Sequence, residues 1–318
     1  MRKFLFLAMA SALVTLFACS GGGKKISLQP NLKPGEKYSL EYKVVMDQDM
    51  KSLNNRITIL MGHLLDVKSV SPQKESDLEL KYNHISIAMK SGNMIDMSYD
   101  SDSSYPAKSA MDMPGGMSDM LRDIYGKVFG SMLNKPMQVK LEANGKVKSV
   151  SGYKELLQSI KDSMQQYLGP GGSAGMDGLM SDKQISDVFQ QLFAGLPQKP
   201  VSVGESWTAD FEMENNGIGM KVSNTYKLVE VLEKENVAVI DVKGKISSAG
   251  NKKINNDGLE MTMELTGTSE GRIEVDLATG ITRTGKVTQD INVTVESKQT
   301  GKMPMTMKTV TTINGKKS

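Results

Sequence analysis

Residues 34–46 read Pro-Gly-Glu-Lys-Tyr-Ser-Leu-Glu-Tyr-Lys-Val-Val-Met, and this stretch gives the clearest indication of the fold class. After the Pro-Gly-Glu turn, apolar side chains occupy every second position from Tyr38 to Met46. Successive side chains of a strand point to opposite faces, so this alternation indicates a strand with one buried face. One-sided strands are typical of antiparallel meanders that pack a single face. The stretch therefore predicts a mainly antiparallel β protein.

The same pattern returns at a constant offset of 169 residues. Gly204 and Glu205 precede a second alternating stretch, which comprises Trp207, Ala209, Phe211 and Met213. A second similarity links Val139, Leu141 and Gly145 with Val275, Leu277 and Gly280. Each of these sets predicts a strand, a glycine turn and a strand. Two interpretations stay open: a duplicated β unit, or unrelated hairpins that look alike.

Between the two repeats the apolar spacing changes to three and four residues, which predicts amphipathic helices. The first carries Met117, Met120, Leu121, Ile124, Tyr125, Val128 and Phe129; the second carries Tyr153, Leu156, Leu157, Ile160, Met164 and Tyr167; the third carries Ile185, Val188, Phe189, Leu192 and Phe193. Ser181 and Gln184 form a capping box before the third helix, and Gly195 is typical of its C-terminal stop.

Alternation resumes in the C-terminal third, where three more strands are predicted. They carry Leu259, Met261, Met263 and Leu265, then Val287, Ile291, Val293 and Val295, then Met303, Met305 and Met307. The expected fold class is α+β, mainly antiparallel β, with curved meander sheets and an insert of about three helices. The expected organisation is a signal peptide at 1–18, a tether at 19–33, a first β unit at 34–110, a helical insert at 111–198 with a β-hairpin at 136–150, and a second β unit at 199–318.

The N-terminus carries the pattern of an export signal. Arg2 and Lys3 precede a mainly apolar run from Phe4 to Leu16, which is shorter than the ~20 residues that a membrane-spanning helix needs. Residues 16–19 (Leu-Phe-Ala-Cys) resemble the lipobox of bacterial lipoprotein precursors. The resemblance implies cleavage before Cys19 and acylation of its thiol; the alternative is an ordinary secretory peptide.

Cys19 is the only cysteine, so no intramolecular disulfide competes for its thiol. Buried acyl methylenes contribute ~0.8 kcal/mol each, and several chains on one residue would hold the protein durably to a membrane. Ser20 follows Cys19 in place of the aspartate associated with inner-membrane retention, so the resemblance implies the outer membrane as partner. We expect a lipid-anchored envelope protein, with the face of the membrane left open.

The composition argues against nucleic-acid binding and catalysis. Lysine and arginine total 39 against 36 acids, and removing Arg2 and Lys3 lowers the formal net charge from +3 to +1. The chain has only two histidines that could act as a general base in acyl-transfer chemistry. Residues 280–286 imitate a phosphate loop, but Val287 replaces the required Ser or Thr and no helix is predicted there. We therefore expect no enzyme and no cofactor other than the covalent lipid.

Two sets of residues are weak candidates for a copper(I) site, because thioethers and imidazoles suit that ion. Met111, Met113, Met117 and Met120 are spaced like copper-binding methionine motifs, although we prefer the explanation that Met117 and Met120 begin the apolar stripe of the predicted helix and that the other two cover the edge of the core. His63 and His84 lie on neighbouring predicted strands, and pairing Val70 with Asp77 would place them opposite each other, with Met61 nearby. A stacked histidine pair, or a displaced register, is the alternative.

Methionine is unusually frequent, with 24 copies, and its flexible side chain suits adaptable apolar surfaces. We predict that ten residues face a hydrophobic ligand: Tyr38, Tyr42, Trp207, Phe211, Met213, Met261, Met263, Met303, Met305 and Met307. The expected function is non-enzymatic binding or carriage of a hydrophobic ligand or lipid. The alternatives are a structural or assembly lipoprotein with envelope-protein partners, and a copper(I)-binding envelope protein.

The Pro-Gly-Glu strand start, the Gly-Glu-Ser-Trp start at 204–207 and the turn from Asp276 to Gly280 resemble an uncharacterised family of Gram-negative lipoproteins, a domain of unknown function. The resemblance covers most of the chain after Cys19 and carries no catalytic residues over. A weaker likeness, at the level of the fold, is to the half-barrel lipoprotein carriers of the periplasm.

Overall fold

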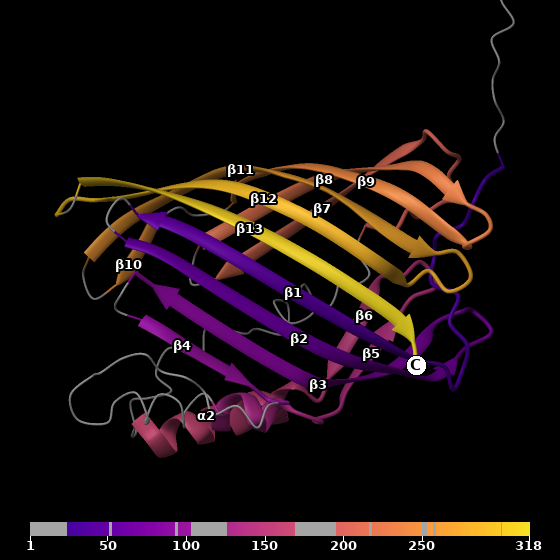
Figure 1. Ribbon diagram of the computed structural model, residues 1–318, viewed down its shortest axis with the longest axis horizontal. Helices are drawn as coiled ribbons and strands as arrows, with labels where there is room; N and C mark the ends of the chain where they lie inside the picture. The colour runs from indigo at the N-terminus through magenta and orange to yellow at the C-terminus, as the bar shows by residue number, and fades with distance from the viewer. Residues whose placement is uncertain are drawn as a thin grey trace, which may run out of the picture.

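A computed structural model describes residues 24–50, 53–92, 95–102, 126–168, 195–215, 218–249, 253–256, 259–299 and 301–318. These residues form one 13-stranded sheet in the order β6-β5-β3-β2-β1-β13-β12-β11-β9-β8-β7, with β4 paired to β3 and β10 paired to β11 (Figure 1). The strands are β1 (Lys37–Met50), β2 (Leu53–Val70), β3 (Ser76–Ser91), β4 (Ile95–Asp100), β5 (Met137–Leu141), β6 (Val147–Ser151), β7 (Ser206–Asn215), β8 (Ile218–Leu232), β9 (Val237–Ala249), β10 (Lys253–Asn256), β11 (Leu259–Asp276), β12 (Thr282–Ser297) and β13 (Gly301–Lys317).

The expected α+β class with about three helices is wrong, because the described residues form a single antiparallel sheet with only two short helices. The described helices are a short one at 126–132 and α2 (Tyr153–Leu168). Several strands are 13 to 18 residues long, well above the usual ~5–6, so strand takes a larger share than the alternating windows suggested. The predicted third helix, with Ser181 and Gln184, lies outside the described residues, as does the start of the first.

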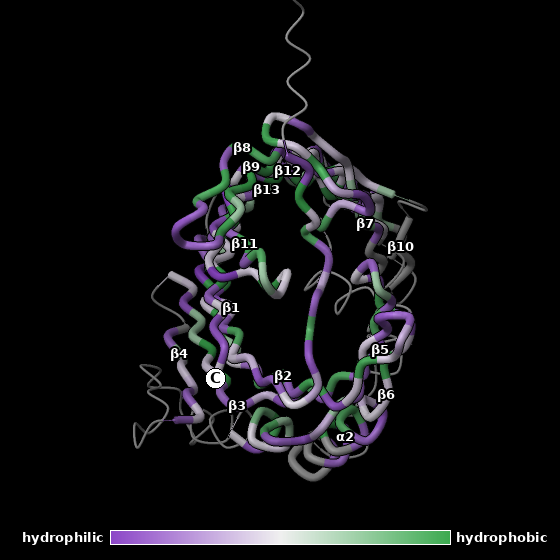
Figure 2. The backbone as a smooth tube through the Cα atoms, turned by 90° about the vertical axis from the view of Figure 1, so that its right-hand side faces the viewer, coloured by the Kyte–Doolittle hydropathy of each residue, from purple (hydrophilic) through white to green (hydrophobic). Residues whose placement is uncertain are grey.

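The two predicted β units join edge to edge, because β1 pairs with β2 on one side and with β13 on the other. Tyr38 therefore lies beside Lys317, at the opposite end of the chain. Seen along the strands, the sheet curls into an incomplete ring, with β5, β6 and β7 across from β1 and β11 (Figure 2). Among the described residues, no helix combines the length and the apolarity that crossing a membrane requires.

The two β units begin with the same turn. Gly35 has φ 83° and donates its N–H to Val67 O at 2.8 Å; Gly204 has φ 93° and donates to Leu228 O at 2.7 Å. These left-handed φ values favour glycine, which explains why Gly-Glu recurs before both strands. Each turn precedes its strand, β1 or β7, and hydrogen-bonds the neighbouring strand, β2 or β8, in the same way.

Bulges recur at matching places in both units. The β2–β3 register shifts between Val67 and Ser69, and the β8–β9 register shifts between Leu228 and Glu230. A second matching pair of bulges lies at Lys140/Leu141 in β5–β6 and at Glu274/Val275 in β11–β12. The shared turns and bulges favour the duplicated-unit interpretation. They also correct its alignment, because Leu141 corresponds to Val275 and not to Leu277.

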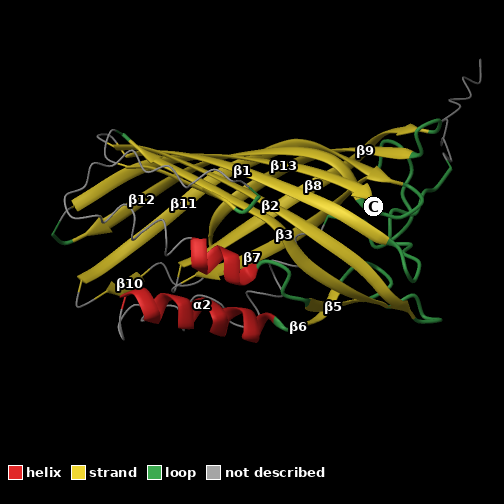
Figure 3. Cartoon of the chain, turned by 60° about the horizontal axis from the view of Figure 1, so that its bottom comes forward, coloured by secondary structure: helices red, strands yellow, loops and turns green. Residues whose placement is uncertain are grey.

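Three apolar clusters form the core. The first joins α2 to β1, β2, β3, β5 and β6 through residues such as Tyr153, Leu156 and Leu80 (Figure 3). The second surrounds Leu28, which is fully buried under β8, β9 and β11. The third lies near the other end of the sheet around Ile246 and Ile291. All three clusters use one face of the sheet, which we call the inward face.

Candidate ligand-binding face of the sheet

Nine of the ten residues predicted to face a ligand share the inward face; the side chain of the tenth, Met213, lies outside the described part of the structure. Strand pairing shows this directly, because Tyr42 lies opposite Met61 and Ile313, Met263 opposite Val295, and Val295 opposite Met303. The ten are Tyr38, Tyr42, Trp207, Phe211, Met213, Met261, Met263, Met303, Met305 and Met307. The sheet therefore brings together residues from both halves of the chain. Contact with a ligand stays a prediction for each of them.

The aromatic candidates differ in their surroundings. Tyr38 is 2% exposed and its hydroxyl donates a hydrogen bond to Glu36 Oε2 at 2.6 Å, so it serves the first cluster. Burial raises the pKa of the Tyr42 hydroxyl. Trp207 is half-buried, donates its Nε1–H to Gly195 O at 2.7 Å and stacks on Tyr226 with ring centroids 5.9 Å apart. Trp207 and Tyr42 thus lie on separate parts of the inward face.

The methionine candidates gather around the third cluster. Met263, Met305 and Met307 pack partly buried against it, together with Phe211. Met303 is 46% exposed, on the C-terminal strand near the hairpin that joins β12 to β13. Flexible thioethers in half-exposed positions can adapt to an irregular apolar guest.

The middle of the inward face is apolar but not packed into any of the three clusters. Val44, Ile59, Ile87, Val287 and Ile313 lie there on five strands, and each is only partly buried. Large apolar side chains left half-exposed on adjoining strands form the kind of surface that marks a binding site. Sequence analysis missed these positions as site residues, although Val44 continues the Tyr38 alternation and Val287 was assigned to a strand face.

Across the middle of the sheet the inward face carries no charge. One rung, meaning residues directly opposite on neighbouring strands, runs through Trp207, Tyr226, Val242, Gly271, Val287, Thr311, Val44, Ile59, Ile87 and Tyr99. An outward rung three residues farther along each strand runs through Asp210, Ser223, Lys245, Thr268, Asp290, Lys308, Asp47, Arg56, Lys90 and Asp96. The same ten strands therefore present an uncharged rung inward and a charged rung outward.

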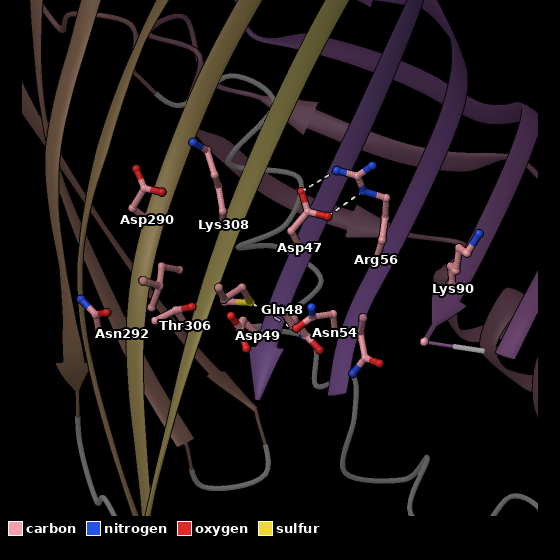
Figure 4. A pocket seen from close by; sticks show the side chains of 14 residues that line it. Asp47, Gln48, Asp49, Asn54, Arg56, Lys90, Asp290, Asn292, Thr306 and Lys308 are labelled. Atoms are coloured by element: carbon pink, nitrogen blue, oxygen red, sulfur yellow. Dashed lines mark hydrogen bonds and ion pairs between the residues drawn. The ribbon is translucent and has the colours of Figure 1, made fainter. Parts of the chain in front are cut away.

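Part of that charged rung lines a pocket of about 770 Å³ (Figure 4). Arg56 binds Asp47 through two hydrogen bonds of 2.6 and 2.9 Å, and this hydrogen bonding holds the pKa of Asp47 below its ordinary value. Three acids and three bases line the pocket, so its formal charge is zero. Because Arg56 is already paired with Asp47, it is not free to bind an anion.

The predicted opposition of His63 and His84 is wrong. His63 pairs with Tyr82, and His84 pairs with Gly62, because the turn pairs Val70 with Ser76 and bulges interrupt the β2–β3 ladder. A bulge between Gly62 and His63 turns His84 to the outward face, where Nε2 lies 2.9 Å from Asp100 Oδ1. The two imidazoles cannot share one ion.

His63 itself is 4% exposed on the inward face, between two tyrosines. Its ring centroid lies 5.5 Å from that of Tyr42 and 4.8 Å from that of Tyr82. Burial lowers the pKa of His63 to about 4, so the ring is neutral at pH 7. In the described part of the chain, no group of three or more His, Cys, Asp or Glu could hold a metal ion. Met111, Met113, Met117, Met120 and Cys19 lie outside the described residues.

A single curled antiparallel sheet with an uncharged apolar face and a charged outer face defines the class of this protein. The chain belongs to the family of unknown function DUF6263, whose sequence profile matches residues 73–282. The predicted resemblance to a family of unknown function is confirmed. That its members are lipoproteins stays a prediction.

Comparison with solved structures finds lipovitellin, in a structure titled for its lipid–protein interactions, at 9% identity and a TM-score of 0.47. The match covers 90% of this chain and 25% of the lipovitellin chain, so this chain spans about a quarter of that protein. An outer membrane channel of Pseudomonas putida F1 matches at 9% identity and a TM-score of 0.23, covering 90% and 97% of the two chains. OccK5 of Pseudomonas aeruginosa matches at 6% identity and a TM-score of 0.22, and the match covers 89% of this chain and 98% of the OccK5 chain. No curated protein sequence matches the chain.

Proposed function

We propose that this chain is a non-enzymatic protein of the cell envelope that binds or carries a hydrophobic ligand or lipid on its inward face. The observation that carries the proposal is the half-exposed, uncharged middle of that face, around Val44, Ile59 and Ile87. Removing apolar surface from water contributes roughly 25 cal/mol per Å², so an apolar guest lying on this surface gains binding energy from contact alone.

The same observation separates this proposal from its alternatives. A structural or assembly lipoprotein would pack the face internally, whereas Val287 and Ile313 lie outside the packed clusters and are partly exposed. A copper(I) protein would gain support from facing histidines, but His63 and His84 point to opposite faces. Carriage of a hydrophobic ligand therefore has the best support.

The proposal includes a lipid anchor on Cys19 in the outer membrane. Ile26 pairs with Val201 at the edge of the described sheet. Ile26 is seven residues after Cys19, and an extended chain spans ~3.5 Å per residue, so the anchor would hold this end of the sheet within roughly 25 Å of the membrane surface. A lipid leaving the membrane would have a short distance to travel to the inward face.

Native mass spectrometry of protein purified from the envelope tests the proposal. We expect a lipid adduct beyond the covalent anchor in the wild-type chain. Ile59→Glu places a charge on the inward face and should remove the adduct, whereas Thr58→Glu, its neighbour on the outward face of β2, should retain it. Circular dichroism confirms that both variants fold. A folded wild-type chain without any adduct, even after incubation with lipid vesicles, would contradict the proposal.

A further inference from the structure

A band of uncharged polar side chains crosses the inward face, between its apolar rungs. We call it the polar belt and define it as Asn224 on β8, Ser269 on β11, Gln289 on β12, Thr309 on β13, Gln48 on β1 and Asn55 on β2. The strand between β8 and β11 contributes Gly244, which has no side chain. Each strand from β8 to β13 thus places a polar side chain, or none, at one level, and β1 and β2 place theirs one inward rung away.

The belt is continuous in register, with one step. Ser269 lies opposite Gln289, and Gln289 lies opposite Thr309. Gln48 lies opposite Asn55 and opposite Met307, two residues from Thr309 on the same face. The belt therefore shifts by one inward rung where the two halves of the chain meet, at the β13–β1 pair.

Only one half of the belt is satisfied internally. Ser269 Oγ donates to Asn224 Oδ1 at 2.7 Å, and Asn224 Nδ2 donates to Tyr226 OH at 3.2 Å. In contrast, Asn55 Oδ1 is buried and has no hydrogen-bond partner among the described residues. Gln48 Nε2 donates to two thioether sulfurs, of Met46 at 3.3 Å and of Met307 at 3.9 Å, and these are weak acceptors.

Unpaired amides on an apolar face are unfavourable for folding, because burial removes them from water without replacing the lost hydrogen bonds. Apolar residues at Gln48 and Asn55 would pack at least as well beside Ile57 and Met307. A bound molecule that offers a carbonyl and a hydroxyl or N–H would supply the missing partners.

We propose that the polar belt hydrogen-bonds the uncharged ester, amide or hydroxyl group of an acyl lipid whose hydrocarbon lies on the apolar rungs beside it. This inference rests on the proposed function and narrows the ligand to a neutral lipid. The third cluster, around Ile291, borders the belt on one side, and the half-exposed Val44 and Ile59 border it on the other. The inward rungs named here carry no charged side chain, and the cations that line the same pocket as Gln48 and Asn55 come from the outward rung and are balanced there by three acids.

Trp207, the only tryptophan of the chain, lies on the inward face one rung from Asn224, so its fluorescence reports a lipid that lies along the Asn224 end of the polar belt. The probes are three brominated lipids that quench tryptophan fluorescence: a monoacylglycerol, the corresponding free fatty acid and the corresponding alkane. We expect saturable quenching, with the monoacylglycerol binding most tightly. Asn55→Leu should weaken monoacylglycerol binding roughly fivefold, the effect of one lost hydrogen bond, and leave alkane binding unchanged.

The matched control is Asn54→Leu, because Asn54 is the exposed neighbour of Asn55 on the outward face of β2. Asn54→Leu should bind all three lipids like the wild type. Equal binding of alkane and monoacylglycerol, unaffected by Asn55→Leu, would overturn the belt inference and leave the proposed function intact. Tightest binding of the ionised fatty acid would overturn the neutral class. Quenching by none of the three would overturn the proposed function itself.

Discussion

Ser269 donates a hydrogen bond to Asn224 although their strands, β11 and β8, are not neighbours in the sheet. The contact exists because Gly244 on the intervening β9 has no side chain, and a Cβ there would clash with both polar groups. A glycine in the middle of a strand usually costs stability, so this one is kept for the close approach across it.

We predict that Gly244→Ala destabilises the fold. The added methyl must push Asn224 and Ser269 apart, and overpacking of this kind typically lowers the free energy of unfolding by about 1–3 kcal/mol. Urea denaturation followed by circular dichroism measures the change. Gly130→Ala is the control, because Gly130 lies in the helix at 126–132 with open space around it and should gain about 0.5–1 kcal/mol. A Gly244→Ala chain as stable as the wild type would refute the clash.

Because His63 is buried, we predict that the folded protein loses stability as the pH falls from about 6.5 to about 4. Burial lowers its pKa to about 4, below the value of ~6.5 in the unfolded chain, so the unfolded state binds the proton first as pH falls. Folding should lose about 3 kcal/mol across this window. His63→Phe should flatten the pH profile of urea denaturation, while His84→Gln on the outward face should keep it. An unchanged slope in His63→Phe would place the titrating group elsewhere.

Trp207 anchors β7 through two separable contacts. Trp207→Phe keeps stacking on Tyr226 but loses the hydrogen bond to Gly195 O, and should lower the free energy of unfolding by about 1 kcal/mol. Trp207→Ala loses both contacts and should cost about 3 kcal/mol, the lower end for truncating a buried aromatic, because the ring is only half-buried. Urea denaturation followed by far-UV circular dichroism measures the free energy of unfolding of each variant. Equal stability of the two variants would assign the whole effect to the indole N–H.

Cys19→Ala should abolish acylation and leave unprocessed or soluble precursor, because residues 16–19 resemble a lipobox and the resemblance predicts acylation of this thiol. Metabolic labelling with an alkyne fatty acid, followed by fractionation of the envelope, measures the loss. Ser20→Ala is the control and should be labelled like the wild type. Equal label in the Cys19→Ala chain would exclude this residue as the anchor.

Local chemistry made much of this protein predictable from its sequence. The alternation from Tyr38 to Met46 and from Trp207 to Phe211 predicted strands, and the structure places these apolar residues together on the inward face. Gly35 and Gly204 predicted two equivalent turns, because few other residues adopt their positive φ values. Each of these signals depends on neighbours within a few residues, so no long-range information was needed.

Tertiary structure alone decided which strands meet and in which register. Pairing of β1 with β13 depends on contacts between residues some 270 positions apart, and no local pattern encodes that choice. The Val70–Ser76 turn and a bulge between Val67 and Ser69 shift the partner of His63 from His84 to Tyr82, while leaving the alternation within β2 intact. The polar belt likewise exists only in the assembled sheet, because Gln48, Asn55 and Gln289 look like isolated interruptions of three strand patterns. Pairing energies between distant segments set the register, and the register determines which polar side chains become neighbours on the inward face.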